Sequence, residues 1–241
     1  MTDDERRIRT IRDVFDAAGD IPMPAAKQTE KKNYAERFSR HMATCVANGL
    51  RKSFPTILPN EDGSRQESPA RTAKGFKKLD VNFSTPELGL ALGVSIKSIH
   101  FADAKTKRFT KNYSRNDNEL RAEATDYHQR QPYSVLVGVL FLPAVACDDG
   151  GRDASSFGAA VKYFRNRAGR TNPHDDPDRF ERFFIAVFDL DRSTCFFDVE
   201  KAPPKSGRPL PEECLDFEGF LAEVVRAYDT RNDPPFEWAR E

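Results

Sequence analysis

Residues 77–101 read KKLDVNFSTPELGLALGVSIKSIHF, and this stretch decides the fold that we expect. Residues 76–83 alternate between apolar and polar side chains, with Asp80 near the middle, which is the pattern of a half-exposed strand. A turn is expected at residues 85–87, and residues 88–101 form a long apolar run that ends in β-type alternation. The two segments therefore predict an antiparallel hairpin.

Helical and strand patterns surround this hairpin. Apolar residues spaced three and four apart predict helices at residues 4–18 and 30–53, and the polar segment 59–74 is expected to be a surface loop. A helix is also expected at residues 114–130, with Ser114 opening a capping box. The further elements expected are a buried strand at 134–142, a helix at 157–167, strands at 183–190 and 194–199, and a helix at 217–228.

The order helix, hairpin, helix and buried strand indicates an α/β fold. The chain has 241 residues, of which 38% are hydrophobic and 32% are charged, and this fits a single domain, residues 1–241. Within it, N-terminal helices are expected in residues 1–58 and the core in residues 74–200. Residues 201–241 are expected to form a C-terminal segment.

Three features predict a cytoplasmic protein without a membrane partner. The N-terminal residues MTDDERRIRT lack the apolar centre of a secretion signal. The longest apolar run, residues 135–145, is interrupted by Gly138 and Pro143 and is too short to cross a bilayer. The four cysteines are isolated and have no zinc-type spacing, which indicates a reducing compartment.

Candidate chemistry gathers on the hairpin and on the helix after it. Ser95 and Lys97 are two residues apart, so both side chains leave the same face of the strand, and the hairpin can bring Asp80 beside them. Glu119 and Glu123 are four residues apart and lie on one side of the helix. Glu123 falls on the face expected to pack on the sheet, where a carboxylate is costly unless it is paired or metal-bound.

Phosphodiester hydrolysis needs side chains of these kinds. Carboxylate oxygens hold Mg²⁺, which lowers the pKa of a bound water and stabilises the charge of the transition state. A lysine beside that water adds positive charge where negative charge develops. We therefore expect Asp80 and Glu123 to be metal ligands, with Glu119 as the alternative ligand, and Lys97 to be catalytic. Ser95 is expected to hydrogen-bond a water or a ligand.

Residues 77–101 resemble the signature of the PD-(D/E)XK nuclease superfamily, in which an Asp on one strand precedes (D/E)-x-Lys on the next. The element order over residues 30–142 is similar to the core of that superfamily. Ser95 stands where the pattern has an acid, as in some type II restriction endonucleases that carry Ser-x-Lys. In those enzymes the acid comes from the following helix, here residues 115–124, RNDNELRAEA.

This resemblance implies a restriction-endonuclease-like core, in which helices flank a mixed central sheet. N-terminal helices and a C-terminal hairpin plus helix would be added to that core. It also implies a Mg²⁺-dependent endonuclease that cleaves double-stranded DNA as a homodimer in a restriction system, with a cognate methyltransferase as partner. Two alternatives stay open. One is a structure-specific repair or phage-defence nuclease of the same fold, and the other is a non-catalytic DNA-binding module, which Ser95 keeps in consideration.

Lys+Arg and Asp+Glu number 38 each, so any DNA footprint must come from local clusters of basic residues. One such cluster lies between Lys97 and Glu123 and is interleaved with Phe109 and Tyr113, and the other begins at Lys162. For both clusters the alternative is a solvated surface. Glu36, on the helix before the hairpin, is also expected to lie on solvated surface. Glu119 and Glu123 have the alternative of pairing with neighbouring Lys or Arg side chains. The candidate DNA-binding residues are Lys105, Lys107, Arg108, Lys111, Arg115, Lys162, Arg165, Arg167 and Arg170.

Overall fold

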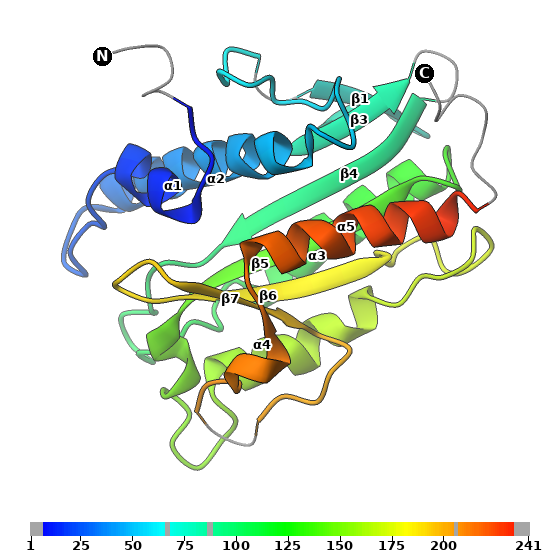
Figure 1. Cartoon of the computed structure of the whole chain (residues 1–241). Coiled ribbons are helices and arrows are strands. Elements are labelled where there is room, and N and C mark those ends of the chain that lie inside the picture. The colour runs from blue at the N-terminus through cyan, green and yellow to red at the C-terminus, as the bar shows by residue number, and fades with distance from the viewer. Residues whose placement is uncertain (1–6, 66–67, 86–88, 205–206, 234–241) are drawn as a thin grey trace.

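The computed structural model describes residues 7–65, 68–85, 89–204 and 207–233. Its centre is a six-stranded mixed sheet with the strand order β3-β4-β5-β6-β7-β8 (Figure 1). The strands are β3 (Val81–Thr85), β4 (Gly89–Ser98), β5 (Val135–Pro143), β6 (Arg182–Phe188), β7 (Thr194–Asp198) and β8 (Cys214–Leu215). The expected α/β class with a mixed central sheet is confirmed.

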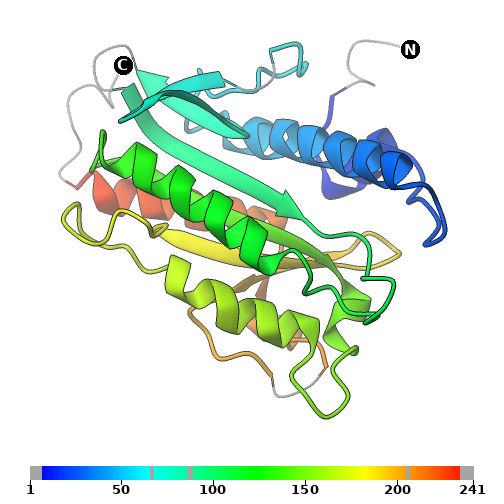
Figure 2. The ribbon, with the colours of Figure 1, turned by 180° about the vertical axis from the view of Figure 1, so that it is seen from behind.

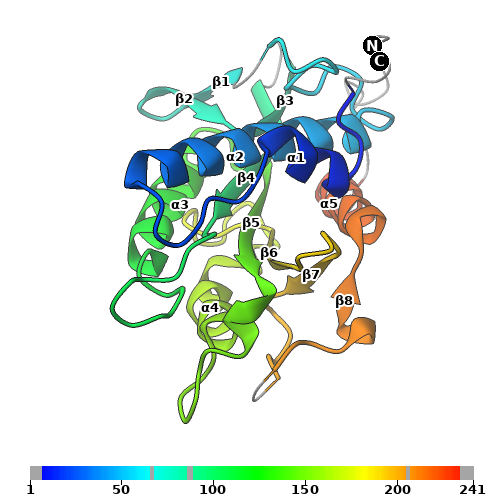
Figure 3. The same cartoon turned by 90° about the vertical axis from the view of Figure 1, so that its left-hand side faces the viewer.

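Helices cover both faces of this sheet. The helices α1 (Ile11–Ala18), α2 (Gln28–Leu50) and α5 (Phe217–Arg231) share one apolar cluster with one face. The helices α3 (Tyr113–His128) and α4 (Ser156–Phe164) share a second cluster with the other face, which Figure 2 shows from behind. Figure 3 looks along the sheet and shows α3 and α4 on one side and α5 on the other. The molecule is therefore a three-layer sandwich.

The directions of the strands determine where polar side chains can meet. β3 is antiparallel to β4, whereas β4, β5 and β6 are mutually parallel, and α3 lies in the crossover from β4 to β5. The apolar segment around residues 134–142 forms the central strand β5, which is buried over its whole length apart from the last residue. The carboxyl ends of the three parallel strands consequently lie along the same edge of the sheet.

The hairpin prediction is confirmed for β3 and β4, but the first strand differs from expectation. Asp80 does not lie in the middle of one strand; it separates β2 (Gly75–Leu79) from β3. The strand divides there because β2 pairs with β1 (Ser68–Thr72) in a separate two-stranded sheet. The surface-loop prediction for residues 59–74 is therefore wrong for β1. Its sequence is polar, but its backbone still forms the hydrogen bonds of a strand with β2.

Other boundaries differ by smaller amounts. The predicted capping box at Ser114 is wrong, because α3 begins at Tyr113 and its N-cap, Asn112, makes no side-chain cap bond. The short strand β8 was not expected within the C-terminal segment. The remaining predicted helices and strands are present with boundaries shifted by a few residues. Residues 7–10 of the first predicted helix are not helical, because α1 begins at Ile11. Residues 4–6 of that predicted helix, residues 86–87 of the predicted turn and residue 88 of the next predicted strand lie outside the described residues.

The expectation of four isolated cysteines is wrong for two of them. Cys195 on β7 and Cys214 on β8 form a disulfide, because the antiparallel pairing of these strands brings their Cα atoms to 5.3 Å. Cys45 and Cys147 are free and buried. The inference of a reducing compartment from the cysteines thereby loses its basis. Within the described residues, no helix is both long and apolar enough to cross a membrane.

Candidate active site

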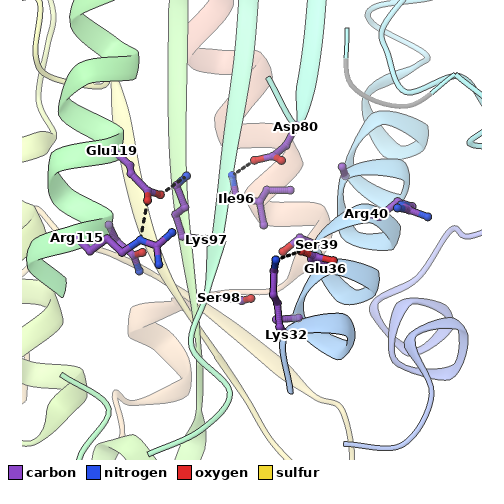
Figure 4. Close-up of a pocket in the computed structure, with 13 residues that line it drawn as sticks. Lys32, Glu36, Ser39, Arg40, Asp80, Ile96, Lys97, Ser98, Arg115 and Glu119 are labelled. Atoms are coloured by element: carbon purple, nitrogen blue, oxygen red, sulfur yellow. Dashed lines mark hydrogen bonds and ion pairs between the residues drawn. The ribbon is translucent and has the colours of Figure 1, made fainter. Parts of the chain in front are cut away.

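A cleft of about 610 Å³ opens between α2, the end of β4 and the start of α3 (Figure 4). It exists because β4 is longer than its neighbour: Val81, the first residue of β3, pairs with Val94, so residues 95–98 extend beyond β3. The cleft lies at this open edge, where side chains from the two helical layers can meet. Among the residues that line it are Asp80, Lys97 and Glu119.

Asp80 closes the open edge of β4. One carboxylate oxygen of Asp80, Oδ2, accepts a hydrogen bond of 2.7 Å from the backbone N–H of Ile96 (Figure 4). The residue immediately before β3 therefore satisfies a backbone donor that a longer β3 would have taken. This bond fixes the Asp80 carboxylate next to the Ser95–Lys97 segment, as the hairpin predicted.

Ser95 and Glu123 are joined across the interface between β4 and α3. Ser95 is only 1% exposed, and its hydroxyl donates a hydrogen bond to the carboxylate oxygen Oε1 of Glu123. Glu123 is half-buried on the helix face that packs on the sheet. The hydroxyl of Ser95 therefore compensates part of the cost of placing a carboxylate there.

Lys97 and Glu119 point toward each other from β4 and α3 (Figure 4). Lys97 Nζ lies 3.3 Å from Glu119 Oε2, and Arg115 Nε donates to Glu119 Oε1 at 2.8 Å. Partial burial by itself raises the pKa of Glu119, but the hydrogen bond from Arg115 and the charge of Lys97 outweigh it, so this pKa lies below its ordinary value. The salt-bridge interpretation of Glu119 is confirmed.

The expected metal ligands occupy neighbouring positions without forming a compact cluster. Asp80 Oδ2 accepts from the backbone N–H of Ile96, and Glu123 Oε1 accepts from the hydroxyl of Ser95, so the two acids contact adjacent residues of β4. In the described part of the chain, however, no three His, Cys, Asp or Glu side chains lie together as a metal-binding group. The acids of this site are one carboxylate before β3 and two on α3, and Mg²⁺ in proteins is commonly held by one or two carboxylates with waters.

Glu36 lines the cleft, whereas the sequence interpretation placed it on solvated surface. Its side chain is exposed, as expected, and forms an i, i+4 ion pair of 3.5 Å with Lys32, but both residues line the same cleft as Asp80. Lys32, Glu36 and Ser39 recur on α2 at spacings of three and four beside the apolar stripe. That spacing was the signal that could have assigned Glu36 to the site.

The first basic cluster is partly engaged within the protein. Lys111 forms an ion pair of 2.8 Å with Asp103, and Arg108 donates to a backbone carbonyl of the loop before α4. The interleaved Phe109 and Tyr113 are buried in the core, so they give this surface no stacking platform. The side chains of Lys105 and Lys107 are exposed.

The second basic cluster agrees less well with DNA binding. Arg170 is only 2% exposed and forms an ion pair of 2.7 Å with Glu181, so its prediction as a DNA contact is wrong. Arg167 forms two ion pairs of 2.6 Å, with Asp117 and Asp178. Arg165 donates to backbone carbonyls after β7. Lys162 remains an exposed cation on α4.

No protein-family model, curated protein or solved structure matches the chain. The resemblance to PD-(D/E)XK nucleases therefore depends on the residues of the hairpin and of α3 themselves. Its consequences for activity, metal and partners are proposals.

Proposed function

We propose that the protein is a Mg²⁺-dependent endonuclease that hydrolyses phosphodiester bonds in double-stranded DNA. One observation carries this proposal: Asp80, Lys97 and Glu119 line a cleft at the open end of β4, and Glu123 contacts Ser95 of the same strand. Lysine and carboxylate side chains at such an edge are the groups that phosphodiester hydrolysis requires.

Each residue has a role within this proposal. Asp80 and Glu123 would hold the metal, because their carboxylates are hard oxygen donors that contact adjacent residues of β4. The bound ion would supply an activated water and positive charge for the transition state. Lys97 would place its ammonium group beside the reacting phosphate, and Ser95 would orient Glu123 through its hydroxyl.

Glu119 suits a positioning role better than a metal-binding role. Its two carboxylate oxygens are already occupied by Lys97 and Arg115. A carboxylate between two cations holds both side chains in the cleft before DNA arrives, and phosphate oxygens can then replace it. Four cationic and three acidic side chains line this cleft: Lys32, Arg40, Lys97 and Arg115, and Glu36, Asp80 and Glu119.

The test is cleavage of mixed-sequence plasmid and phage DNA with Mg²⁺ by the native chain, by Lys97→Ala and by Lys52→Ala. Lys52 is an exposed lysine at the end of α2 outside the cleft and serves as the matched control. We expect cleavage by the native chain and the control, and a loss of at least roughly 100-fold in Lys97→Ala, the usual cost of removing one charge-stabilising donor. Undiminished cleavage by Lys97→Ala, or by the native chain in EDTA, would refute the proposal.

The products distinguish the narrower assignments. Discrete fragments indicate a type II restriction endonuclease, which we favour, with a cognate methyltransferase as its partner and cytoplasmic DNA as its substrate. Cleavage at branched or single-stranded sites only indicates a repair or phage-defence nuclease. DNA binding without cleavage favours the non-catalytic module, to which the serine at position 95 points. Cutting both strands at one site requires two active sites, so a homodimer is part of the proposal, to be tested by the solution mass with DNA bound.

A further inference from the structure

A second pocket, of about 640 Å³, lies at the carboxyl ends of β4, β5 and β6. Residues that follow or end these strands line it, including His100 after β4, Pro143 on β5 and Phe188 on β6. This is the edge of the sheet turned toward the viewer in Figure 3. In open α/β sheets, ligands bind preferentially outside the carboxyl ends of parallel strands. Its volume is in the range of small-molecule sites, roughly 300–1,000 Å³.

The walls of this pocket are mainly apolar and partly open to solvent. Phe101 and Phe188 contribute aromatic rings. Ile21, Val145 and Leu190 line the pocket although they are 41%, 61% and 94% exposed, respectively. Large apolar side chains gathered at the mouth of a cavity indicate a surface that a ligand covers.

His100 lines the same pocket and lacks polar partners. The residue is 8% exposed, and within the described part of the chain neither ring nitrogen has a hydrogen-bond partner. Burial lowers the pKa of His100 to about 3, so the ring is neutral and offers one donor and one acceptor. The hydroxyl of Tyr34, whose ring centroid lies 4.9 Å from that of His100, is likewise unpartnered. Buried polar groups without partners are costly and call for an explanation.

Positive charge surrounds the mouth of the pocket. Lys31, Lys107 and Arg208 line it. Lys31 Nζ lies 5.3 Å from the centroid of the Phe101 ring, and Arg208 forms an ion pair of 2.6 Å with Asp189. Asp103 also lines the pocket and is paired with Lys111, and Lys31 Nζ donates to the carbonyl of Pro24. Among the described residues no ion pair joins Lys31 or Lys107 to an acid, so these two cations would attract an anion at the mouth.

We propose that this pocket binds one nucleotide unit. Aromatic and aliphatic walls suit the planar base, and Lys31 and Lys107 suit its phosphate. Both ring nitrogens of His100 are buried, so the imidazole must rotate to present one of them to the polar edge of the base. A half-turn of the imidazole about the Cβ–Cγ bond exchanges each nitrogen with a ring carbon without changing the outline of the ring, so His100 can adapt to a base edge. The nucleotide is either free or is a base turned out of a strand that crosses the active-site cleft.

The second of these possibilities, a base turned out of a DNA strand, extends the nuclease proposal and depends on it. The end of β4 and the residues after it connect the two sites, because Lys97 and Ser98 line the cleft and His100 lines the pocket. The three residue-to-residue steps from Lys97 to His100 span roughly 10 Å in extended backbone, which is close enough for one DNA strand to reach both sites. A base that leaves its stack needs such a pocket beside the reacting phosphate.

The first experiment titrates the four deoxynucleoside monophosphates into the native chain by calorimetry, without Mg²⁺. We expect a Kd of roughly 100 micromolar or tighter for at least one of them. His100→Phe keeps the aromatic volume and removes the nitrogens, so we expect it to fold with unchanged or higher Tm and to weaken binding at least about tenfold. Lys107→Ala should weaken binding several-fold, whereas Lys27→Ala, an exposed lysine outside the pocket, should not change it.

The second experiment uses an oligonucleotide duplex that carries the fluorescent base 2-aminopurine, bound by the native chain without Mg²⁺. A rise in fluorescence that His100→Phe abolishes, with no binding of free nucleotides, assigns the pocket to a base from the strand. Absence of both signals, or signals equal in the native chain, His100→Phe and Lys107→Ala, overturns the inference. Because neither readout needs cleavage, DNA cleavage without nucleotide binding would leave the nuclease proposal intact and refute only this one.

Discussion

Glu181 holds together the most completely buried ion cluster that the structure describes, and we predict that Glu181→Gln is strongly destabilising. Its Oε1 accepts hydrogen bonds from Arg170 at 2.7 Å and from Arg231 at 2.9 Å, while Oε2 accepts one of 2.7 Å from the backbone N–H of Leu136. The side chains of Arg170, Arg231 and Glu181 are 1%, 5% and 5% exposed. The cluster joins the loop after α4, the start of β6 and the C-terminal helix α5.

The expected size of the effect follows from this burial. Glutamine keeps the shape of the side chain but leaves two guanidinium groups buried without their shared anion. Breaking a buried pair in this way costs about 3–5 kcal/mol, a large part of a total stability of about 5–15 kcal/mol. For a chain of this length, each kcal/mol corresponds to about 2–4 °C, so we expect Tm to fall by roughly 6–20 °C.

Glu200→Gln provides the matched control. Glu200 pairs with Arg182 at 2.8 Å, but these side chains are 41% and 35% exposed. An exposed pair contributes at most about 1 kcal/mol, so this Tm should change by only a few degrees. Calorimetric or circular-dichroism melting of both variants at neutral pH measures the difference. Equal losses of Tm in the two variants would show that burial does not set the strength of the Glu181 cluster.

The same cluster predicts a pH dependence with a definite sign. Burial alone raises the pKa of Glu181, but the neighbouring His128 ring at 3.5 Å, the charge of Arg231 and the hydrogen bond from the Leu136 N–H together lower it below its ordinary value of 4.5. A lowered pKa in the folded state means that the stabilisation is complete above the unfolded value and is lost as the pH falls through the folded value. The Tm difference between the native chain and Glu181→Gln should therefore shrink below about pH 4.5.

Three further substitutions test the site and the sheet. Asp80→Asn keeps an oxygen that accepts the neighbouring backbone N–H, so it should change urea stability by less than about 1 kcal/mol while lowering Mg²⁺-dependent cleavage at least roughly 100-fold. Gly138→Ala places a Cβ 2.4 Å from Phe183 Cδ2 across β5 and β6, and the urea midpoint should show a cost of about 1–3 kcal/mol. Replacing both Cys195 and Cys214 with Ser opens a loop of sequence separation 19 and should cost about 2–4 kcal/mol, with no further loss on adding a thiol.

The part of the site that lies on the hairpin could be predicted from the sequence, because its spacing is local. Alternation in the strand places Ser95 and Lys97 on one face, and a hairpin must bring Asp80 beside them. Local spacing could not decide between Glu119 and Glu123 as the metal ligand, because both lie on one side of the same helix. The structure shows that α3 runs against β4, so the earlier strand residue meets the later helix residue: Ser95 meets Glu123, and Lys97 meets Glu119.

Other features escaped the sequence because their partners are distant in the chain. The position of Arg170 in a polar segment suggested a surface, and its burial is offset by the ion pair with Glu181 and by hydrogen bonds to the carbonyls of Pro132 and Pro173. The disulfide depends on the pairing of β7 with β8, a strand of two residues that no periodicity could indicate. The strand β1 was missed because its polar sequence shows no alternation of apolar and polar residues. Its pairing with β2 is made by the backbone.

The serine at position 95 has a physical reason within the nuclease proposal. An acid at this position would be almost fully buried in direct contact with Glu123, and two carboxylates that close cannot both stay ionised at neutral pH. A serine there donates to the Glu123 carboxylate and stabilises its charged form. The serine on the strand and the acid on the helix therefore belong to one arrangement, in which the carboxylate is supplied by α3 and the hydroxyl by β4. Glu119 then remains available to hold Lys97 and Arg115 at the mouth of the cleft.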